Sequence, residues 1–282
     1  MRVTTLIENG TLEGREDLKA EFGLSLHIQR GDLQILFDTG ASGAFAGNAE
    51  RLGIDLATVD LAVLSHHHYD HGGGLQRFLA INDRARVHLR ASGWVPRFFR
   101  ALVVVKRPIG LDPSLFDTFA HRFELITASA EIAPGVVLVT DIGSRHPRPE
   151  GNRHLYVERG GALEPDPFEH ELVLVVREDD GIVVFTGCSH HGILNMIEAA
   201  RDRFPDLPVK AVFGGFHLVG VPFLDSMAAP REEVESIGRT MLELVAGPVF
   251  TGHCTGRRAF GVLAGVMGGA LRPFATGTSV EV

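Results

Sequence analysis

The sequence predicts a mixed α/β (α+β) fold, a four-layer αββα sandwich. Short apolar runs typical of strands alternate with amphipathic stretches typical of helices, and the second half of the chain repeats the order of the first. Two such halves would stack two sheets between outer helices. Hydrophobic residues make up 45% of the chain, enough for a large core, and its 33 glycines suit many tight loops on a sheet scaffold.

The expected elements follow from apolar runs and from the turn residues that bound them. In the first half we expect strands over residues 3–8, 25–29, 34–37, 61–64 and 86–89, and a helix over 45–52. In the second half we expect strands over 136–140, 172–176, 182–185, 209–213 and 248–250, and helices over 193–203 and 232–245. The last helix would bury Val234, Ile237, Met241 and Leu244 on one face.

The length of 282 residues exceeds that of an average domain, but layered folds of this size often form a single unit. We therefore expect one domain over residues 1–282. The segment at about 92–171 departs from the regular alternation, since aromatic and basic residues interleave in it and prolines break its later part. We interpret this segment as a substrate-binding insertion.

Charge and composition narrow the class of partner. The formal net charge is −8, so we expect no general nucleic-acid surface, which would need a basic stripe to collect phosphates. The N-terminus has an acidic residue, Glu8, where a signal peptide would need an apolar stretch, and no apolar run approaches the roughly 20 residues of a membrane span. The 2 cysteines do not suggest a disulfide framework. We expect a cytoplasmic protein that acts on a small molecule without a membrane partner, and its oligomeric state stays open.

The most informative motif reads His-His-His-Tyr-Asp-His over residues 66–71. Imidazole and carboxylate at this spacing are ligands that Zn, Fe and Mn accept. The motif follows the expected strand 61–64 and precedes three glycines, so we place it on a strand-to-helix loop. A solvated surface histidine run is the alternative, but this four-ligand pattern rarely arises by chance with 14 His in 282 residues.

The spacing within this motif predicts two metal ions. His66 and His68 are two apart, so in an extended segment they project to the same side and can grip one ion. Asp70 and His71 follow at the turn and can face a second ion. We expect two divalent transition-metal ions, Zn first, with Fe, Mn or Ni as alternatives.

The motif resembles the signature of the metallo-β-lactamase superfamily. Other motifs support the resemblance in order: an early Asp-Thr-Gly at 38–40, then Gly-Cys-Ser-His at 187–190, Gly-Gly-Phe-His at 214–217 and Gly-His-Cys at 252–254. This combination is similar to a branch labelled dihydropterin ribofuranosylaminobenzene phosphate synthase. The resemblance implies the αββα fold and an Asp-Thr-Gly turn that buttresses the metal-binding loop.

The resemblance also implies a set of metal ligands. It assigns His253 to the second ion, together with Asp70 and His71. The family's third histidine for the first ion comes from a Gly-His-Thr turn that this chain lacks. We assign His190 to that place because it lies just past a strand end, and His146 is the alternative.

Two further positions carry expectations taken from the resemblance. Cys188 stands where most members have a bridging aspartate, and a thiolate can ligate Zn or Fe at about 2.3 Å. A small buried packing residue is the alternative for Cys188. His217 corresponds to a histidine that protonates the leaving oxygen in phosphodiesterase branches, although a ligand or a hydrogen-bond partner of a ligand is also open. We expect His217 and Asp70 to be catalytic.

The insertion supplies candidate substrate contacts. Basic and aromatic side chains there could bind a phosphate and a flat ring, and we name Trp94, Arg97, Arg100 and Lys106. The alternative is that Trp94, Phe98 and Phe99 pack an inserted helix onto the core.

The expected function is metal-dependent hydrolysis. A metal-bound hydroxide would attack a phosphoester or cyclic phosphodiester, with a pterin- or nucleotide-like substrate. Two alternatives come from other classes: an iron-dependent redox enzyme of the same fold, and a non-catalytic binding protein that contains metal.

Overall fold

The computed structural model describes residues 1–92, 94–101, 105–220 and 226–282. The chain folds into two compact units, each built from segments far apart in sequence. The first unit comprises Met1–Ile126, Leu155–His170 and Phe274–Val282, and the second comprises Thr127–His154 and Glu171–Pro273.

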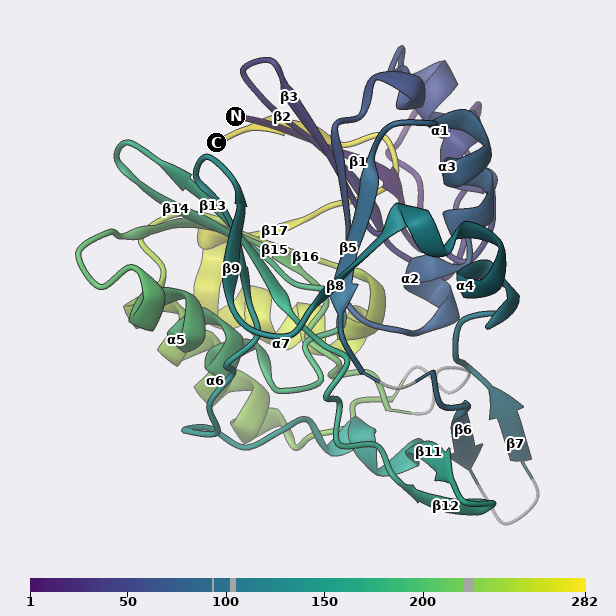
Figure 1. Ribbon diagram of the computed structural model, residues 1–282. Helices are drawn as coiled ribbons and strands as arrows, with labels where there is room; N and C mark the ends of the chain where they lie inside the picture. The colour runs from purple at the N-terminus through teal and green to yellow at the C-terminus, as the bar shows by residue number, and fades with distance from the viewer. Residues whose placement is uncertain (93, 102–104, 221–225) are drawn as a thin grey trace. The chain divides into compact units, whose positions relative to one another are not determined.

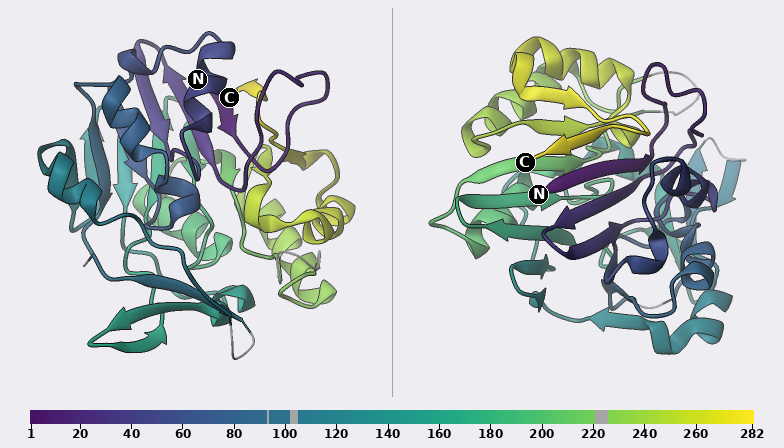
Figure 2. Two further views of the ribbon diagram at one scale, coloured as in Figure 1. Left: turned by 90° about the vertical axis from the view of Figure 1, so that its right-hand side faces the viewer. Right: turned by 90° about the horizontal axis from the view of Figure 1, so that it is seen from above.

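A seven-stranded mixed sheet forms the centre of the first unit (Figure 1). Its strands, in spatial order, are β18 (Ser279–Glu281), β1 (Arg2–Ile7), β2 (Ser25–Arg30), β3 (Leu33–Phe37), β4 (Leu61–Leu64), β5 (Arg86–Arg90) and β8 (Phe123–Ile126). Strands β3, β4, β5 and β8 run parallel, so the loops that follow them emerge at the same edge of the sheet. The outermost pair, β18 and β1, brings the two chain ends together, as Figure 2 shows.

Helices α1 (Ala44–Arg51), α3 (Leu75–Ile81) and α4 (Ser114–Phe119) pack on this sheet. Phe45 and Phe78, both fully buried, contribute the largest helix side chains to the core that these helices share with strand residues such as Leu36 and Val87. The short helix α2 (Tyr69–Gly72) follows β4 directly. Leu36 pairs with Ala62, and Ala62 pairs with Val87, so the three residues lie in one row across the sheet, on the face that these helices cover.

A separate four-stranded antiparallel sheet also belongs to the first unit. Its order is β12 (Ala162–Pro165), β11 (Leu155–Arg159), β6 (Arg97–Ala101) and β7 (Val105–Pro108). Phe98 and Phe99 lie in β6 and pair with Tyr156 and Leu155 of β11, so the alternative of an inserted helix at these aromatics is wrong. Pairing with a distant strand overrides the helical spacing of the aromatic residues, because β structure depends on partners outside the local sequence.

The second unit contains another seven-stranded sheet. Its strands, in spatial order, are β17 (Leu271–Pro273), β16 (Val249–Thr251), β15 (Val209–Gly214), β14 (Gly181–Phe185), β13 (Val173–Glu178), β10 (Val136–Val139) and β9 (Ala130–Ala133). The segment 92–171, expected to be an insertion, therefore contributes strands to both units. Strands β14, β15, β16 and β17 run parallel, so the loops after β14, β15 and β16 lie at one edge of the sheet.

Three helices cover one face of this second sheet: α5 (Ile193–Arg203), α6 (Arg231–Leu244) and α7 (Arg257–Met267). Met196 of α5, Met241 of α6 and Leu263 of α7 are fully buried in a core that includes Val184 and Val212 of the strands. The helix predicted over 193–203 and the strand predicted over 61–64 have the bounds of α5 and β4, and the other predicted elements differ from the structure by at most two residues at either end. Within the described part of the chain, every helix is too short or too polar to cross a bilayer.

Candidate metal centre

The metal-binding motif lies on the loop between β4 and α2, as the sequence predicts. His68 is the last extended residue before α2 begins. Glycines behind the loop permit close packing on the turn after β3, because a Cβ on Gly73 would lie 2.2 Å from the Ala41 carbonyl oxygen and a Cβ on Gly74 would lie 2.3 Å from that of Thr39. The motif is therefore held tightly against the Asp-Thr-Gly turn.

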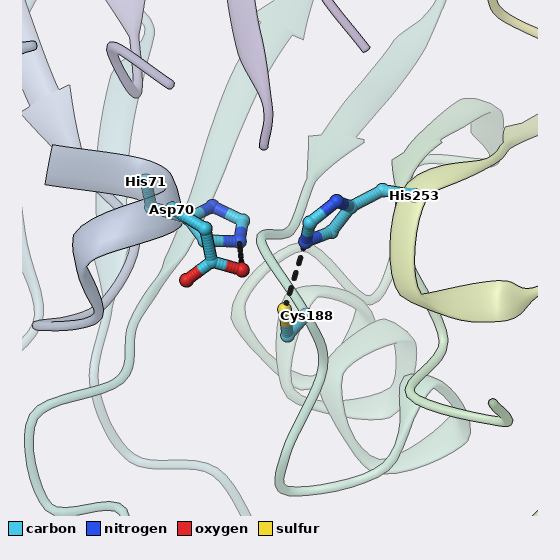
Figure 3. A group of neighbouring side chains, drawn as sticks. All are labelled: Asp70, His71, Cys188 and His253. Carbon is cyan, nitrogen blue, oxygen red and sulfur yellow. Dashed lines mark hydrogen bonds and ion pairs between the residues drawn. The ribbon is translucent and has the colours of Figure 1, made fainter. Parts of the chain in front are cut away.

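The four expected ligands on this loop gather in the first unit. His66 and His71 are 0% exposed, His68 is 4% exposed and Asp70 is 7% exposed. The ring centroid of His66 lies 4.6 Å from that of His68 and 4.2 Å from that of His71. The Asp70 Oδ2 atom lies 3.8 Å from His71 Nε2, the pair joined by a dashed line in Figure 3. A solvated histidine run would not be buried in this way.

Asp38 organises this half of the centre. Its Oδ2 atom lies 2.6 Å from His71 Nδ1, and its Oδ1 atom accepts a 2.7 Å hydrogen bond from the Ser65 amide. The Ser65 hydroxyl bonds Asp38 Oδ2 and lies 2.9 Å from His66 Nδ1. Thr39 bonds the His71 carbonyl oxygen through both its amide and its hydroxyl. The Asp-Thr-Gly turn thus holds the backbone of the loop and the rings of His66 and His71.

Burial favours the neutral form of two histidines of this motif, His67 and His68. Burial, and secondarily the nearby His170, lowers the pKa of His67 and His68 well below the usual 6.5. A neutral imidazole is the form that binds a metal ion, so the burial of His68 favours ligation at neutral pH. His67 is itself 1% exposed, whereas Tyr69 points outward with 41% of its surface exposed.

The second unit supplies the other expected ligands at the ends of its parallel strands. Cys188 and His190 follow β14, His217 follows β15 and His253 follows β16. Ser189, His217 and His253 each have φ between 49° and 60°, a left-handed conformation that is uncommon outside glycine. Such strained residues persist only where the surrounding structure holds them, and they cluster at functional sites.

The side chains at this edge of the second sheet lie within ligand distance of one another. Cys188 Sγ lies 3.4 Å from His253 Nε2, and both residues are 3% exposed. A dashed line joins the two side chains in Figure 3. Ligand atoms of Cys188, His190 and His217 all lie within 4.8 Å of one another. The rings of His190 and His217 meet edge to face, with centroids 4.4 Å apart.

Two residues that the sequence reading missed hold His190. Asn152 Oδ1 lies 3.0 Å from His190 Nδ1, and the Asn152 amide group donates to the His190 carbonyl oxygen. The Glu171 carboxylate, 1% exposed, accepts hydrogen bonds from the backbone amides of His190 and His191. Glu171 carries a weak sequence signal as an acidic residue directly before an apolar strand, and Asn152 carries none.

His217 occupies an unusual environment. Its backbone N–H donates to Cys254 Sγ at 3.3 Å, and a Cβ on Gly151 would come within 3.1 Å of its Nε2 atom. Both ring nitrogens are buried and make no hydrogen bond to any described residue. His146, the alternative to His190, belongs to none of the ligand groups of the described residues. Its backbone N–H donates to Asn195 Oδ1, and its ring lies 3.7 Å from the Glu198 carboxylate.

The four expected substrate contacts differ in their surroundings. Arg97 is 5% exposed and its Nε atom lies 3.3 Å from Asp166 Oδ2, so this guanidinium is buried beside a carboxylate, and its role as a substrate contact stays a prediction. Lys106 pairs with Glu158 and lies over the Phe98 ring. Arg100 is exposed. Trp94 is 38% exposed and stacks on the rings of Phe116 and His67, so its binding role, like that of Arg100 and Lys106, stays a prediction.

The donor set fits transition-metal ions. Nδ1 of His66, His71 and His190 each has an oxygen partner, namely Ser65, Asp38 and Asn152. Such a partner fixes the ring orientation and presents Nε2 as the ligand atom, which is the usual arrangement around metal-binding histidines. Imidazole, carboxylate and thiolate together suit Zn and Fe better than Mg or Ca.

Comparison with known proteins places this geometry in context. The family model described as the metallo-beta-lactamase superfamily matches residues 19–253. The crystal structure of a metal-dependent hydrolase of the β-lactamase superfamily is 32% identical and superposes with a TM-score of 0.81, covering 100% of this chain and 99% of the other. The predicted mixed α/β fold is confirmed, and a sandwich is consistent with it.

Two proteins of Methanocaldococcus jannaschii are also similar. A 7,8-dihydropterin-6-methyl-4-(beta-D-ribofuranosyl)-aminobenzene-5'-phosphate synthase is 27% identical over 238 residues, which cover 80% of this chain and 76% of the synthase. An uncharacterised protein is 30% identical over 207 residues, which cover 72% of this chain and 75% of the other.

Proposed function

Since the chain belongs to the metallo-β-lactamase superfamily, we propose that it is a metal-dependent hydrolase with two divalent metal ions, Zn first among them. The proposed ligands of the first ion are His66, His68 and His190. Those of the second would be Asp70, His71, His253 and Cys188. The support is the family and the donor chemistry that each unit carries by itself.

One observation carries the proposal: histidines in both units have Nδ1 held by an oxygen partner. Asp38 holds His71 and Asn152 holds His190, so neither ring can turn without losing a buried hydrogen bond. The cost of losing a buried hydrogen bond is about 1–3 kcal/mol, which keeps each Nε2 atom pointing in one direction. Preorganised imidazoles of this kind serve metal binding better than packing, for which an apolar side chain would suffice.

When bound, such ions would activate a water molecule as nucleophile and polarise the substrate oxygen that it attacks. At the leaving group, the proposed proton donor of the protein is His217. Its ring nitrogens are buried and have no hydrogen-bond partner in the described part of the chain, so they are available to a substrate oxygen, and the proposed role of the ring is to protonate the departing one. The left-handed backbone at His217, with φ of 49°, sets the direction of that ring.

The proposed substrate is a small phosphoester or cyclic phosphodiester. The name of the 27% identical synthase contains both a pterin and a phosphate, which supports this class of substrate for the present chain. Arg100 and Lys106, on β6 and β7, are exposed cations in the first unit and are proposed to attract the phosphate. Trp94 is proposed to contact a flat ring through its exposed edge.

The test combines metal analysis with a substrate panel. Protein purified without chelator, and protein reconstituted with Zn²⁺, is assayed on phosphomonoesters, cyclic phosphodiesters, thioesters and lactams. We expect up to two metal equivalents per chain and turnover on a phosphoester that chelation removes and Zn²⁺ restores.

Absence of metal after reconstitution would exclude the proposal. Metal without turnover on the whole panel would favour a binding protein, and iron with oxygen consumption would favour a redox enzyme.

A further inference from the structure

A buried hydrogen-bond chain in the first unit ends on the metal-binding loop. The backbone N–H of His67, the residue between the ligands His66 and His68, donates to His170 Nδ1 at 3.0 Å. His170 Nε2 in turn lies 3.2 Å from Asp166 Oδ2, and the same oxygen faces Arg97 Nε at 3.3 Å. His170, Asp166 and Arg97 are 0%, 7% and 5% exposed.

The hydrogen bonds determine the tautomer of His170. Because the His67 amide can only donate, His170 Nδ1 must be the acceptor and carry no proton. The proton of the neutral ring then lies on Nε2 and is donated to the Asp166 carboxylate. Ligand atoms of His68, Asp166 and His170 lie within 4.8 Å of one another, but both nitrogens of His170 are engaged in this way, so the trio is better described as a hydrogen-bond chain than as a third metal site.

The segment that carries His170 is itself held in a strained turn. Phe168 has φ of 61°, an outlier for a bulky side chain, and is 1% exposed. The Phe168 N–H donates to Asp166 Oδ1 at 2.8 Å, so one carboxylate fixes the turn with one oxygen and His170 with the other. A conformation of this kind is strained and persists only when its surroundings require it.

The ring of His170 also packs against the rings of the loop. Its centroid lies 5.3 Å from those of His67 and His68 and 6.0 Å from that of His66. The ring thus packs against the rings of the ligand pair while its Nδ1 atom accepts the hydrogen bond from the backbone between them. No motif marks it in the sequence, where His170 reads as a buried or surface histidine.

We propose that His170 and Asp166 are positioning residues that fix the backbone of the metal-binding loop at His67. The inference rests on the proposed function, because it gives the loop's rigidity a role in metal affinity. Residues that hold a metal ligand without touching the metal generally matter for affinity. Mutating such a residue typically lowers the metal affinity by about 10–100-fold.

The test begins with hydrogen exchange of the His67 amide in metal-free protein, which reports the bond without any metal. We expect a protected amide in the wild type and loss of at least about tenfold in protection in His170→Phe, which keeps a ring but removes both hydrogen bonds. Asp166→Asn should act in the same direction, because an amide NH₂ facing Nε2 favours the tautomer with a proton on Nδ1. His170→Asn keeps an acceptor near the place of Nδ1 and should restore most of the protection.

The second measurement is the Zn²⁺ dissociation constant, obtained by competition with a chelator. We expect His170→Phe and Asp166→Asn to weaken binding about 10–100-fold, with His170→Asn between them and the wild type. The matched control is His27→Phe, since His27 is a 5% exposed histidine of the same unit whose ring bonds Gln34, away from the loop. Circular dichroism and thermal midpoints identify any variant that fails to fold. The variants that do fold then test the positioning role.

The outcomes distinguish failure of the positioning role from failure of the proposed hydrolase function. An unprotected His67 amide in the wild type, or protection unchanged in His170→Phe, overturns the hydrogen-bond chain. Lost protection with unchanged Zn²⁺ affinity overturns the positioning role. A wild type that binds no Zn²⁺ but shows the expected protection pattern supports the hydrogen-bond chain and overturns the proposed hydrolase instead.

Discussion

His71 Nδ1 lies 2.6 Å from Asp38 Oδ2, and both side chains are fully buried. The pair joins the turn after β3 to the loop after β4, two parallel neighbours whose ends meet at one edge of the sheet. Asp38 also bonds Ser65, the first residue of that loop. One carboxylate therefore sets both the path of the loop and the orientation of a proposed ligand ring.

Replacing Asp38 with Asn should weaken metal binding. The amide can no longer accept from both His71 and Ser65 through Oδ2, so the ring loses its fixed tautomer, and we expect about 10–100-fold lower Zn²⁺ affinity. Chelator competition measures the change. Asp55→Asn is the control, because Asp55 caps a 3-10 helix in the same unit and Asn caps equally well. Equal affinities for both variants would contradict the role of Asp38.

His68→Ala and Asp70→Ala should each abolish hydrolysis while leaving the fold largely intact. Both side chains belong to the buried loop and are proposed to ligate different ions, so either loss removes one ion's binding. Turnover and metal content are measured together with circular dichroism. His121→Ala, at an exposed histidine of the same unit, should behave as the wild type. Full activity in either loop variant would show that the motif does not serve catalysis.

His217→Ala tests the proton donor. If the ring protonates the leaving oxygen, the variant should keep its metal and lose about 10²–10⁴-fold in rate, with a smaller loss on substrates that carry a good leaving group. The rate constants on a series of aryl phosphates measure this. Loss of one metal equivalent would make His217 a ligand instead, in keeping with its place within 4.8 Å of Cys188 and His190.

Cys188→Ser tests the thiolate. Cys188 Sγ lies 3.4 Å from His253 Nε2, close enough for the two atoms to share an ion. A thiolate is a softer ligand than a hydroxyl, so the variant should lose affinity for Zn²⁺ at the second ion. Metal titration followed by mass spectrometry measures the stoichiometry. The comparison is with the wild type, because the other cysteine, Cys254, contacts the backbones of both Cys188 and His217 through its Sγ atom. Zn²⁺ binding in Cys188→Ser identical to that of the wild type would mean that Cys188 only packs.

The stability of the metal-free protein should fall as the pH drops below about 6.5. Burial lowers the pKa of His27 and His88 below 6.5, so the unfolded chain binds protons there that the folded chain does not. The stability is complete above pH 6.5 and decreases toward the folded pKa, by at most about 1.4 kcal/mol per pH unit for each group.

Urea unfolding at several pH values measures this dependence. His27→Phe should flatten it, whereas His121→Phe, at an exposed position, should leave it unchanged. A steeper dependence in His27→Phe would reverse the sign that burial predicts.

The sequence by itself determined most strands of the two seven-stranded sheets, helices α1, α5 and α6, and the loop that carries the histidine motif. These features depend on local periodicity, and the motif's ligand types and spacing are read from six consecutive residues. The Asp-Thr-Gly turn could also be predicted from the sequence, because its place after one strand and before the next is a local pattern.

Only the tertiary structure decided which side chains orient the ligands. Asn152 reaches His190 from 38 positions away, and His170 reaches His67 from 103 positions away. Nothing in the sequence near Arg97 indicates that it is buried beside Asp166. Hydrogen bonds of this kind depend on how distant segments pack. A local pattern of polar residues cannot specify them, because the same side chain can form hydrogen bonds with many different partners.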